Sequence, residues 1–358
     1  MTPDRPVTCM SLRQLADGEV DGPLLDALGG LVEPLVLVDL DVPVDAALLA
    51  QAGAEARACE RVLVGVRTGE PPGEQWNQLL ESLDLTMTTV SSGRTACSCV
   101  PLRDPAAAAR ALHAAAIASP QAALALAQVL RATEPLDVRS ALNVESFAYS
   151  MLLGGAQFRR WLARRPVRLI PEPGPEPAVM AERSGELLRV TLNRPARRNA
   201  YSRELRDALT EALAVPALDD TITRVVLAGA GPSFCSGGDL DEFGTTPDPA
   251  IAHFIRTNAG AGSLLHHIAA RTEARVHGAC VGAGIELAAF AGQVVAEPGT
   301  TFRLPEIAMG LIPGAGGTVS LPRRIGRWRT LYLALSGVSL DADTAARWGL
   351  ADQLVTEG

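Results

Sequence analysis

The chain has 358 residues, of which 47% are hydrophobic and 20% charged, and its formal net charge at pH 7 is −8. This composition is typical of a globular protein with about two domains, and the negative charge argues against a general nucleic-acid binder, because contacts to phosphate need clustered cations. Every basic residue is Arg, so a phosphate-bearing ligand would be held by guanidinium groups, backbone N–H groups or helix N-termini.

Several other classes are also excluded. The beginning of the chain mixes acidic, basic and short apolar stretches, unlike a signal peptide, and no apolar run approaches the roughly 18 residues of a membrane-spanning helix. The six cysteines lack the spacing of a zinc site, and a chain of this length does not need a disulfide framework. We therefore expect a cytoplasmic protein without a metal site, which binds neither nucleic acid nor membrane.

The first half of the chain predicts alternating strands and helices. Strands are expected at 34–40, 61–67, 85–90 and 96–102, and helices at 45–58 and 76–83. From 105 to 165 the pattern is almost entirely helical, and Pro120 and Pro135 are expected to divide it into about three helices.

The segment PEPGPEP at 171–177 separates the two halves. Four prolines in seven residues cannot form a helix, so we expect an extended linker. After it, strands are predicted at 187–195, 222–230, 273–282 and 293–299, helices at 202–218, 285–292 and 326–349, and a last short strand at 350–355. Ser202 is expected to cap the first of these helices. The strand–helix–strand order is typical of an α/β protein.

Three segments of the second half carry candidate chemistry. In SFCSGGDL, 233–240, two glycines let backbone N–H groups approach a ligand closely. In HGACVGAGIEL, 277–287, small residues begin a helix, whose free N–H groups face outward. Two such N–H groups that converge on one carbonyl oxygen would form an oxyanion hole. The third segment, RLPEIAMGLIPGAGGT at 303–318, places Glu306 in a proline-flanked turn, 20 positions after Glu286.

These segments, together with LNRPARRNA at 192–200, resemble the enoyl-CoA hydratase/isomerase family, also called the crotonase superfamily. The resemblance covers about 186–358. It implies an α/β fold with a ββα spiral core, an acyl-CoA substrate, and an enolate-like anion held between two backbone N–H groups. Those donors would be Gly238 and Ala283, with Ala at position 283 in place of the more usual Gly.

The resemblance also implies the acid and base. Hydratases of the family carry two glutamates, and this chain has both, Glu286 and Glu306. The pair would position a water for addition to the β-carbon, while Glu306 exchanges the proton at the α-carbon. Two close carboxylates titrate as a coupled pair, with one pKa raised. Isomerases of the family can work with the second glutamate alone, so isomerisation or another acyl-CoA reaction remains open.

The remaining expected site residues bind the substrate and its CoA. The resemblance places them at Arg197, Ser236, Gly237, Asp239, Leu240, Gly282, Pro313 and Gly314. Arg197 matches a loop that lies near the CoA phosphates in the family, and it is equally consistent with a solvated charge. No cofactor is expected beyond the CoA or phosphopantetheine thioester of the substrate.

Other interpretations of these motifs are weaker. The glycines at 314–317 fail the GxGxxG pattern at its last position, which excludes a dinucleotide site. Cys235 and Cys280 are better explained as small buried thiols than as nucleophiles. His266 and His267 lie on a predicted helix and are expected to be structural or exposed.

The helical pattern of the first half has a counterpart in the family. Family members normally continue beyond the position of Val355 with a helical tail that covers the acyl pocket and helps to form trimers, and 104–168 resembles that tail. The expected organisation is a degenerate crotonase-like α/β region at 1–103, a helical lid and oligomerisation segment at 104–170, a linker at 171–185 and the catalytic core at 186–358. The lid would cover its own core or that of a neighbour in a homotrimer or hexamer.

Two classes of function follow. The first is an enoyl-CoA hydratase-like lyase of fatty acid or secondary metabolism, with isomerisation or other enolate chemistry as the enzymatic alternative. The second is a non-catalytic acyl-CoA-binding scaffold partner, which the degenerate first region makes conceivable. Glu286 and Glu306 argue against the scaffold, because it would need neither.

Overall fold

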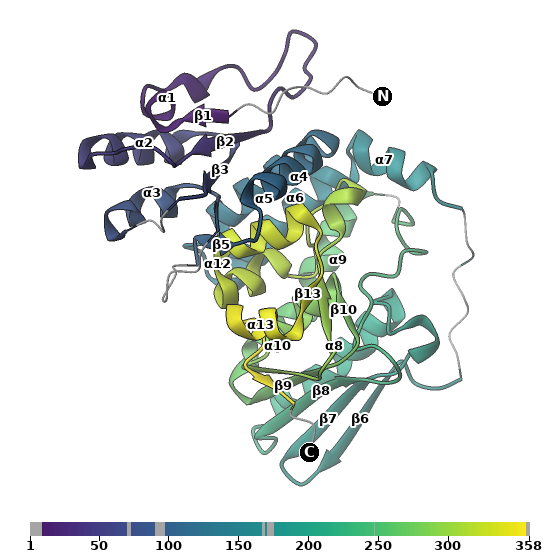
Figure 1. The fold of residues 1–358 in the computed structure, drawn as a ribbon. Coiled ribbons are helices and arrows are strands. Elements are labelled where there is room, and N and C mark those ends of the chain that lie inside the picture. The colour runs from purple at the N-terminus through teal and green to yellow at the C-terminus, as the bar shows by residue number, and fades with distance from the viewer. Residues whose placement is uncertain are drawn as a thin grey trace. The chain divides into compact units, whose positions relative to one another are not determined.

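The computed structural model describes residues 9–69, 73–89, 97–166, 169, 175–246 and 248–355. The chain divides into two compact units (Figure 1). Unit 1 comprises Met1–Arg131 and Gly326–Ser336, and unit 2 comprises Ala132–Ile325 and Gly337–Gly358.

Unit 1 is built on a parallel sheet whose five strands follow one another in chain order. The strands are β1 (Cys9–Ser11), β2 (Leu35–Asp39), β3 (Val62–Arg67), β4 (Leu85–Thr88) and β5 (Cys99–Pro101). The helices are α1 (Leu12–Ala16), α2 (Ala46–Ala58), α3 (Asn77–Ser82), α4 (Pro105–Ala118) and most of α5 (Pro120–Thr133). The four strands predicted for this region are confirmed as β2–β5, apart from residues 90–96, which lie outside the described residues.

A buried ion pair joins the helices of unit 1 to its sheet. Asp84 is 2% exposed and accepts a 2.7 Å hydrogen bond from Nε of Arg131 on α5. The same guanidinium donates to the carbonyl of Arg61 at 2.7 Å. The charges are paired and hydrogen-bonded, which is what a buried ion pair needs to be tolerated.

Unit 2 contains two sheets. The larger has the strand order β14 (Gln353–Leu354), β11 (Gln293–Ala296), β9 (Thr272–Val276), β8 (Arg224–Gly229), β7 (Leu187–Leu192) and β6 (Val179–Ser184). Its strands are parallel except for the antiparallel β6–β7 pair. The smaller sheet consists of β10 (Ala279–Val281), β12 (Thr301–Arg303) and β13 (Leu340–Asp341).

Helices of unit 2 come from both sides of the proline-rich segment. Before it are α6 (Val138–Leu153) and α7 (Ala156–Ala163), and after it are α8 (Arg203–Leu218), α9 (Pro249–Ala259), α10 (Gly262–His267), α11 (Ala283–Ala288), the first part of α12 (Gly317–Ser336) and α13 (Ala342–Trp348). Ser202 caps α8 as predicted, because its hydroxyl accepts from the N–H of Leu205 at 3.2 Å. Of the segment 104–170, predicted as a helical lid, α6 and α7 belong to unit 2, and the lid remains a prediction.

Some sequence-based boundaries are wrong. The segment from 105 to 165 forms four helices instead of three, because extended backbone at Gly155 separates α6 from α7. The helix predicted at 326–349 is interrupted: Gly326 has a φ of 81° within α12, and β13 follows before Asp341 caps α13. The last strand is shorter than predicted, at 353–354. Of the segment 171–177, residues 171–174 lie outside the described residues.

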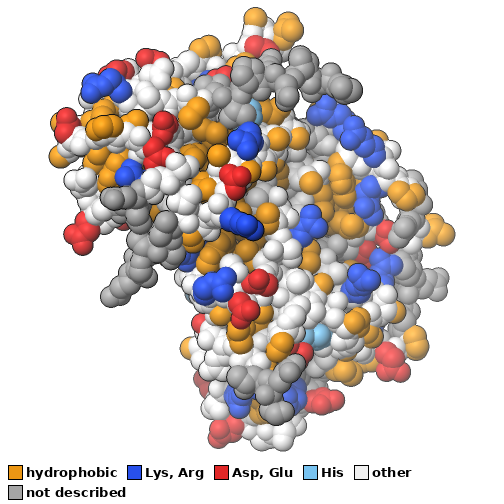
Figure 2. Space-filling model, in the orientation of Figure 1, with side chains coloured by type: hydrophobic (Ala, Val, Ile, Leu, Met, Phe, Trp, Pro, Cys, Tyr) orange, Lys and Arg blue, Asp and Glu red, His pale blue; other side chains and the backbone are white. Residues whose placement is uncertain are grey.

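The surface drawn in Figure 2 carries arginine and carboxylate side chains interspersed with hydrophobic ones. Among the described residues, no single helix is long and apolar enough to cross a membrane, although α4 and α5, bent by 108°, pass that test of length and composition as a pair. The described residues also include no cluster of three or more potential metal ligands.

Candidate active site

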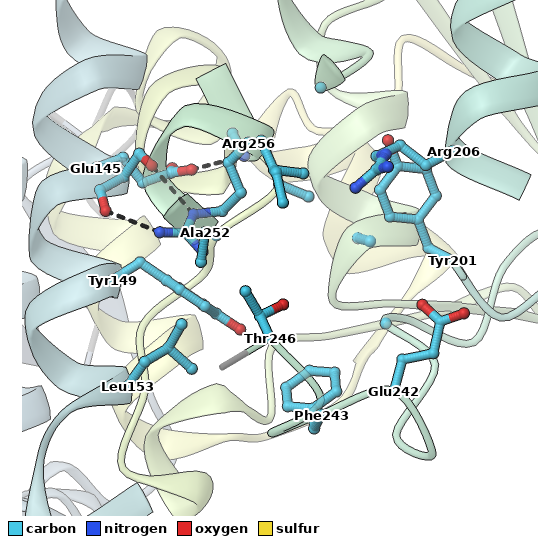
Figure 3. A pocket seen from close by; sticks show the side chains of 18 of the residues that line it. Glu145, Tyr149, Leu153, Tyr201, Arg206, Glu242, Phe243, Thr246, Ala252 and Arg256 are labelled. Atoms are coloured by element: carbon cyan, nitrogen blue, oxygen red, sulfur yellow. Dashed lines mark hydrogen bonds between the residues drawn. The ribbon is translucent and has the colours of Figure 1, made fainter. Parts of the chain in front are cut away.

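A cavity of about 540 Å³ lies in unit 2. Its walls come from α6, α7, α8, α9, α11, the turn before α12 and the loop between β8 and α9. Figure 3 shows Tyr149 and Leu153 projecting from α6 toward Thr246 and Phe243 of that loop. The sequence-predicted residues that line the cavity are Gly238, Asp239, Ala283, Glu286, Glu306 and Gly314.

Glu286 lies on α11 and is 2% exposed. One of its carboxyl oxygens, Oε2, accepts hydrogen bonds from the N–H groups of Ala315 at 2.7 Å and Gly317 at 2.9 Å. Gly317 must be glycine for this contact, because a Cβ would lie 2.6 Å from Cγ of Glu286. The local sequence GAGG therefore serves to bring backbone donors onto a carboxyl group.

Glu306 begins the short 3-10 helix η5 (Glu306–Met309). Its Oε2 is buried and has no hydrogen-bond partner. Its other oxygen, Oε1, faces Gly282, where a Cβ would lie only 2.6 Å away. Glu306 thus differs from Glu286: one carboxyl is held by two backbone donors, and the other has an oxygen free for a proton or a ligand.

A third buried carboxyl group, Glu145, belongs to the same site. It lies on α6, is 2% exposed and lines the cavity. Oε1 accepts from the N–H of Gly316 at 2.8 Å, and Oε2 accepts from the N–H of Thr318 at 2.9 Å and from its hydroxyl at 2.8 Å. The motif-based prediction missed this residue.

Burial raises the pKa of all three carboxyl groups. The pKa of Glu306 is raised to about 8, by burial and then by the charge of Glu145, and burial raises that of Glu145 to about 7. The pKa of Glu286 is raised well above its usual range by burial, then by the charges of Glu306 and Glu145. The three groups cannot all be ionised at neutral pH, so the cluster holds protons that it can transfer.

Two predicted N–H donors, those of Gly238 and Ala283, belong to residues that line the cavity. Ala283 is the first residue of α11, so its N–H has no acceptor within the helix. Gly238 lies opposite Tyr201 in an isolated β-bridge, but its own N–H takes no part in it. The carbonyl of Gly237 accepts from the N–H of Tyr201, and the N–H of Asp239 donates to the carbonyl of Tyr201. Within the described ranges, neither the N–H of Gly238 nor that of Ala283 has a backbone acceptor. The two groups predicted as an oxyanion hole are therefore available to a ligand in the cavity.

Arg197 does not line the cavity. Its Nη2 lies 2.6 Å from Oδ1 of Asp239 and 2.9 Å from Oδ2 of Asp241. This guanidinium is thus already paired with two carboxylates in the segment that carries Gly238. Its assignment to CoA binding stays a prediction.

The remaining predicted residues do not line the cavity; they are Ser236, Gly237, Leu240, Gly282 and Pro313. Gly237 (φ 98°) and Gly282 (φ 50°) adopt backbone that L side chains rarely adopt. The N–H of Ser236 donates to the carbonyl of Arg198 at 3.0 Å. Leu240 is half-buried, and Pro313 packs against Gly317.

The cysteines near these motifs are unsuited to nucleophilic chemistry. Cys235 and Cys280 are fully buried, and burial raises the pKa of Cys235 to about 12 and that of Cys280 well above its usual value. A thiol that stays protonated is a poor nucleophile. His266 and His267 are exposed on α10, as predicted.

Tyr149 and Arg256 form another part of the wall that the sequence motifs did not indicate. Arg256 on α9 lies over the ring of Tyr149 on α6, at 4.7 Å from its centroid. The guanidinium donates from Nε to the hydroxyl of Ser146 at 3.0 Å and also to Ser150. Figure 3 shows Tyr149 and Arg256 on the same side of the cavity as Glu145. Only a tertiary contact between two helices could have identified them.

Residues 182–358 match the family model described as Enoyl-CoA hydratase/isomerase. Among curated proteins, the chain is 36% identical over 175 residues to 1,2-epoxyphenylacetyl-CoA isomerase of Escherichia coli (strain K12), which covers 48% of this chain and 67% of that protein. It is also 36% identical over 176 residues to 2,3-dehydroadipyl-CoA hydratase of the same organism, with coverage of 49% and 68%.

Solved structures show similarity over the same extent. An enoyl-CoA hydratase from Mycobacterium smegmatis has a TM-score of 0.47 and 32% identity, and the match covers 51% of this chain and 71% of that one. An enoyl-CoA hydratase subunit from Geobacillus kaustophilus HTA426 has a TM-score of 0.47 and 29% identity, with coverage of 50% and 69%.

Proposed function

We propose that this chain, which belongs to the enoyl-CoA hydratase/isomerase family, adds water to a 2-enoyl thioester of CoA or removes it from a 3-hydroxyacyl thioester. The observation that carries the proposal is the pair of buried, dissimilar carboxyl groups, Glu286 and Glu306, which share one cavity with the free N–H groups of Gly238 and Ala283. The acyl thioester is proposed on the strength of the family.

The thioester carbonyl would accept hydrogen bonds from the N–H groups of Gly238 and Ala283. Negative charge develops on this oxygen when a nucleophile attacks the β-carbon, and fixed donors stabilise that charge. One such donor typically contributes on the order of 10²–10³ in rate. These donors act through the backbone, so Ala at position 283 serves as well as Gly.

The carboxyl pair would move the protons of water. The reaction starts from the form in which Glu286 is ionised: the N–H groups of Ala315 and Gly317 stabilise this carboxylate against burial, which raises its pKa. Glu286 then takes a proton from water as the water oxygen bonds to the β-carbon, and the electron pair of the double bond passes to the enolate. Protonated Glu306 then gives its proton to the α-carbon as the carbonyl re-forms. The sum is addition of one water, and a proton passes from Glu286 back to Glu306 to complete the cycle. A pKa of about 8 keeps Glu306 protonated at neutral pH.

Isomerisation is the second candidate. It needs a single carboxyl that moves a proton between two carbons, and Glu306 has a free oxygen for this purpose. A relative with isomerase in its name is as similar to this chain as one with hydratase in its name. The scaffold function is favoured by none of these residues.

Hydration is tested with crotonyl-CoA, whose conjugated-enoyl absorbance disappears on turnover. We expect turnover by the wild type and its loss in Glu286→Gln and Glu306→Gln. Glu211→Gln is the matched control, because that carboxylate is exposed on α8. A 3-enoyl-CoA that gains absorbance, with no hydration of any 2-enoyl-CoA, would identify an isomerase. Binding without turnover of either substrate class would favour the scaffold.

A further inference from the structure

Two carboxyl groups divide the donors at the start of α12 between them. The N–H groups of Ala315 and Gly317 donate to Glu286. The N–H groups of Gly316 and Thr318 donate to Glu145. The four successive N–H groups at 315–318 thus donate alternately to Glu286 on α11 and to Glu145 on α6. Each carboxyl group binds two N–H groups of the turn at 315–318, and so holds that turn where its other two N–H groups reach the second carboxyl group.

We propose that Glu145 is a positioning residue for the hydration reaction, which fixes the turn at 315–318 and, through that turn, the carboxyl group of Glu286. The proposal rests on the proposed function. It also means that a helix preceding the proline-rich segment completes the catalytic pair, although residues 182–358 alone match the family model.

The hydrogen bonds at Glu145 need a side chain with two acceptor oxygens. Its two oxygens receive three donors, two backbone N–H groups and the hydroxyl of Thr318. A glutamine would present its NH₂ group to one of these donors, and an alanine would leave three buried donors without an acceptor. Either change should release the turn at 315–318, and with it the N–H groups that hold Glu286.

Charged and titratable groups face Glu145 from every neighbouring element of the site. They are Tyr149 on α6, Arg256 on α9, Glu286 on α11 and Glu306 on η5. The charge on Glu145 raises the pKa of both Glu286 and Glu306. Removal of this charge should therefore lower the pKa values of Glu286 and Glu306, and move the titration of that pair to lower pH.

The test uses the full chain with Glu145→Gln and, as control, Glu211→Gln. We expect kcat for crotonyl-CoA to fall by about 10- to 100-fold, as misplacement of a catalytic group by about 1 Å does. The KM and the affinity for the unreactive butyryl-CoA should change by less than about threefold. The pH profile of kcat should shift to lower pH. Unchanged kcat and pH profile, or an equal loss of kcat and of butyryl-CoA affinity, would overturn the proposal.

A second pair of variants covers the case in which Glu145→Gln does not fold. Thr318→Val removes only the hydroxyl that donates to Oε2 of Glu145, and Thr318→Ser keeps it. We expect Thr318→Val to lower kcat by about fivefold, the equivalent of one typical hydrogen bond, and Thr318→Ser to retain it. Equal kcat in both variants would contradict the proposal.

A third measurement does not depend on turnover, so it separates this inference from the proposed function. An infrared titration follows the protonated carboxyl groups from about pH 5 to about pH 10, where buried carboxyls with raised pKa ionise. In Glu145→Gln the remaining signal should be lost at lower pH than in the wild type, and hydrogen exchange at 315–318 should accelerate. An unchanged titration and exchange would overturn the role of Glu145, even if no enoyl thioester were hydrated.

Discussion

The carboxyl group of Glu306 fits against Gly282, because a Cβ at position 282 would lie 2.6 Å from Oε1. Gly282 has a φ of 50° and directly precedes α11. One residue therefore determines both how closely Glu306 can approach the backbone and where the N–H of Ala283 lies. The same peptide segment thus contacts the proposed acid, Glu306, and leads into the proposed oxyanion donor, Ala283.

Gly282→Ala should therefore displace Glu306. We expect kcat to fall by at least about tenfold, since proton transfer is already disturbed when the carboxyl group of Glu306 moves by a fraction of the radius of a carbon atom. Gly185→Ala is the matched control: its φ is 60°, but nothing lies within 4 Å of its Cβ position. Both variants carry the strain of a positive φ, so equal kcat values in the two would show that the contact with Glu306 is unimportant.

Glu306 should lower the free energy of unfolding as the pH rises. Its pKa in the folded protein is about 8, above its ordinary value of 4.5, so the folded state binds more protons than the unfolded state between these values. Stability is then fully present below about pH 4.5 and is lost as the pH rises through about 8. Glu306→Gln removes the group that ionises, and its free energy of unfolding should exceed that of the wild type by on the order of 1–4 kcal/mol near pH 8.

Urea unfolding at about pH 5 and about pH 8 measures this difference. Near pH 5 the two proteins should be almost equally stable, and Glu211→Gln should follow the wild type at both values. A Glu306→Gln protein that is less stable than the wild type at the higher pH would contradict the raised pKa. Lower activity together with higher stability would mark Glu306 as a site where function is kept at the expense of stability.

The proposed oxyanion donor at Ala283 can be removed without a change of side-chain charge. Proline is tolerated at the first position of a helix and has no N–H, and Ala283 is that position in α11. Ala283→Pro should lower kcat by on the order of 10²–10³, whereas Ala283→Gly, which keeps the N–H, should remain near the wild type. Circular dichroism and thermal unfolding check that both variants are folded. Similar kcat values in the two would exclude this N–H from catalysis.

The candidate site was predictable where its residues lie in local backbone motifs. Glu286, Glu306, Gly238 and Ala283 each stand in a short segment that resembles a motif of the enoyl-CoA hydratase/isomerase family, and all four line one cavity. Glu145 was not predictable in this way, since it lies within an ordinary helical pattern and its partners come from distant turns. A buried carboxylate on a helix becomes informative only when the tertiary contacts are known.

The secondary structure, too, was predictable only where the local sequence pattern determines it. Strands such as β7 and β8 and the helix α8 with its Ser202 cap follow from local pattern. The pattern at 326–349 predicted one helix, but the backbone at Gly326 has a φ of 81° and β13 separates α12 from α13. Helical propensity is a weak prior that tertiary pairing overrides, as the pairing of β13 with β12 does here.

The role of Arg197 can be decided by comparing two substrates. Its guanidinium pairs with Asp239 and Asp241, which follow Gly238 in the chain. We therefore expect it to hold the segment that carries the proposed N–H donor of Gly238. Arg197→Met should then lower kcat/KM by a similar factor for crotonyl-CoA and for crotonyl-pantetheine, which lacks the nucleotide phosphates. Arg183→Met is the control, because Arg183 pairs with Asp219 and does not line the cavity. A loss confined to crotonyl-CoA would instead assign Arg197 to the phosphates, as the sequence suggested, because only that substrate offers an anion to a guanidinium.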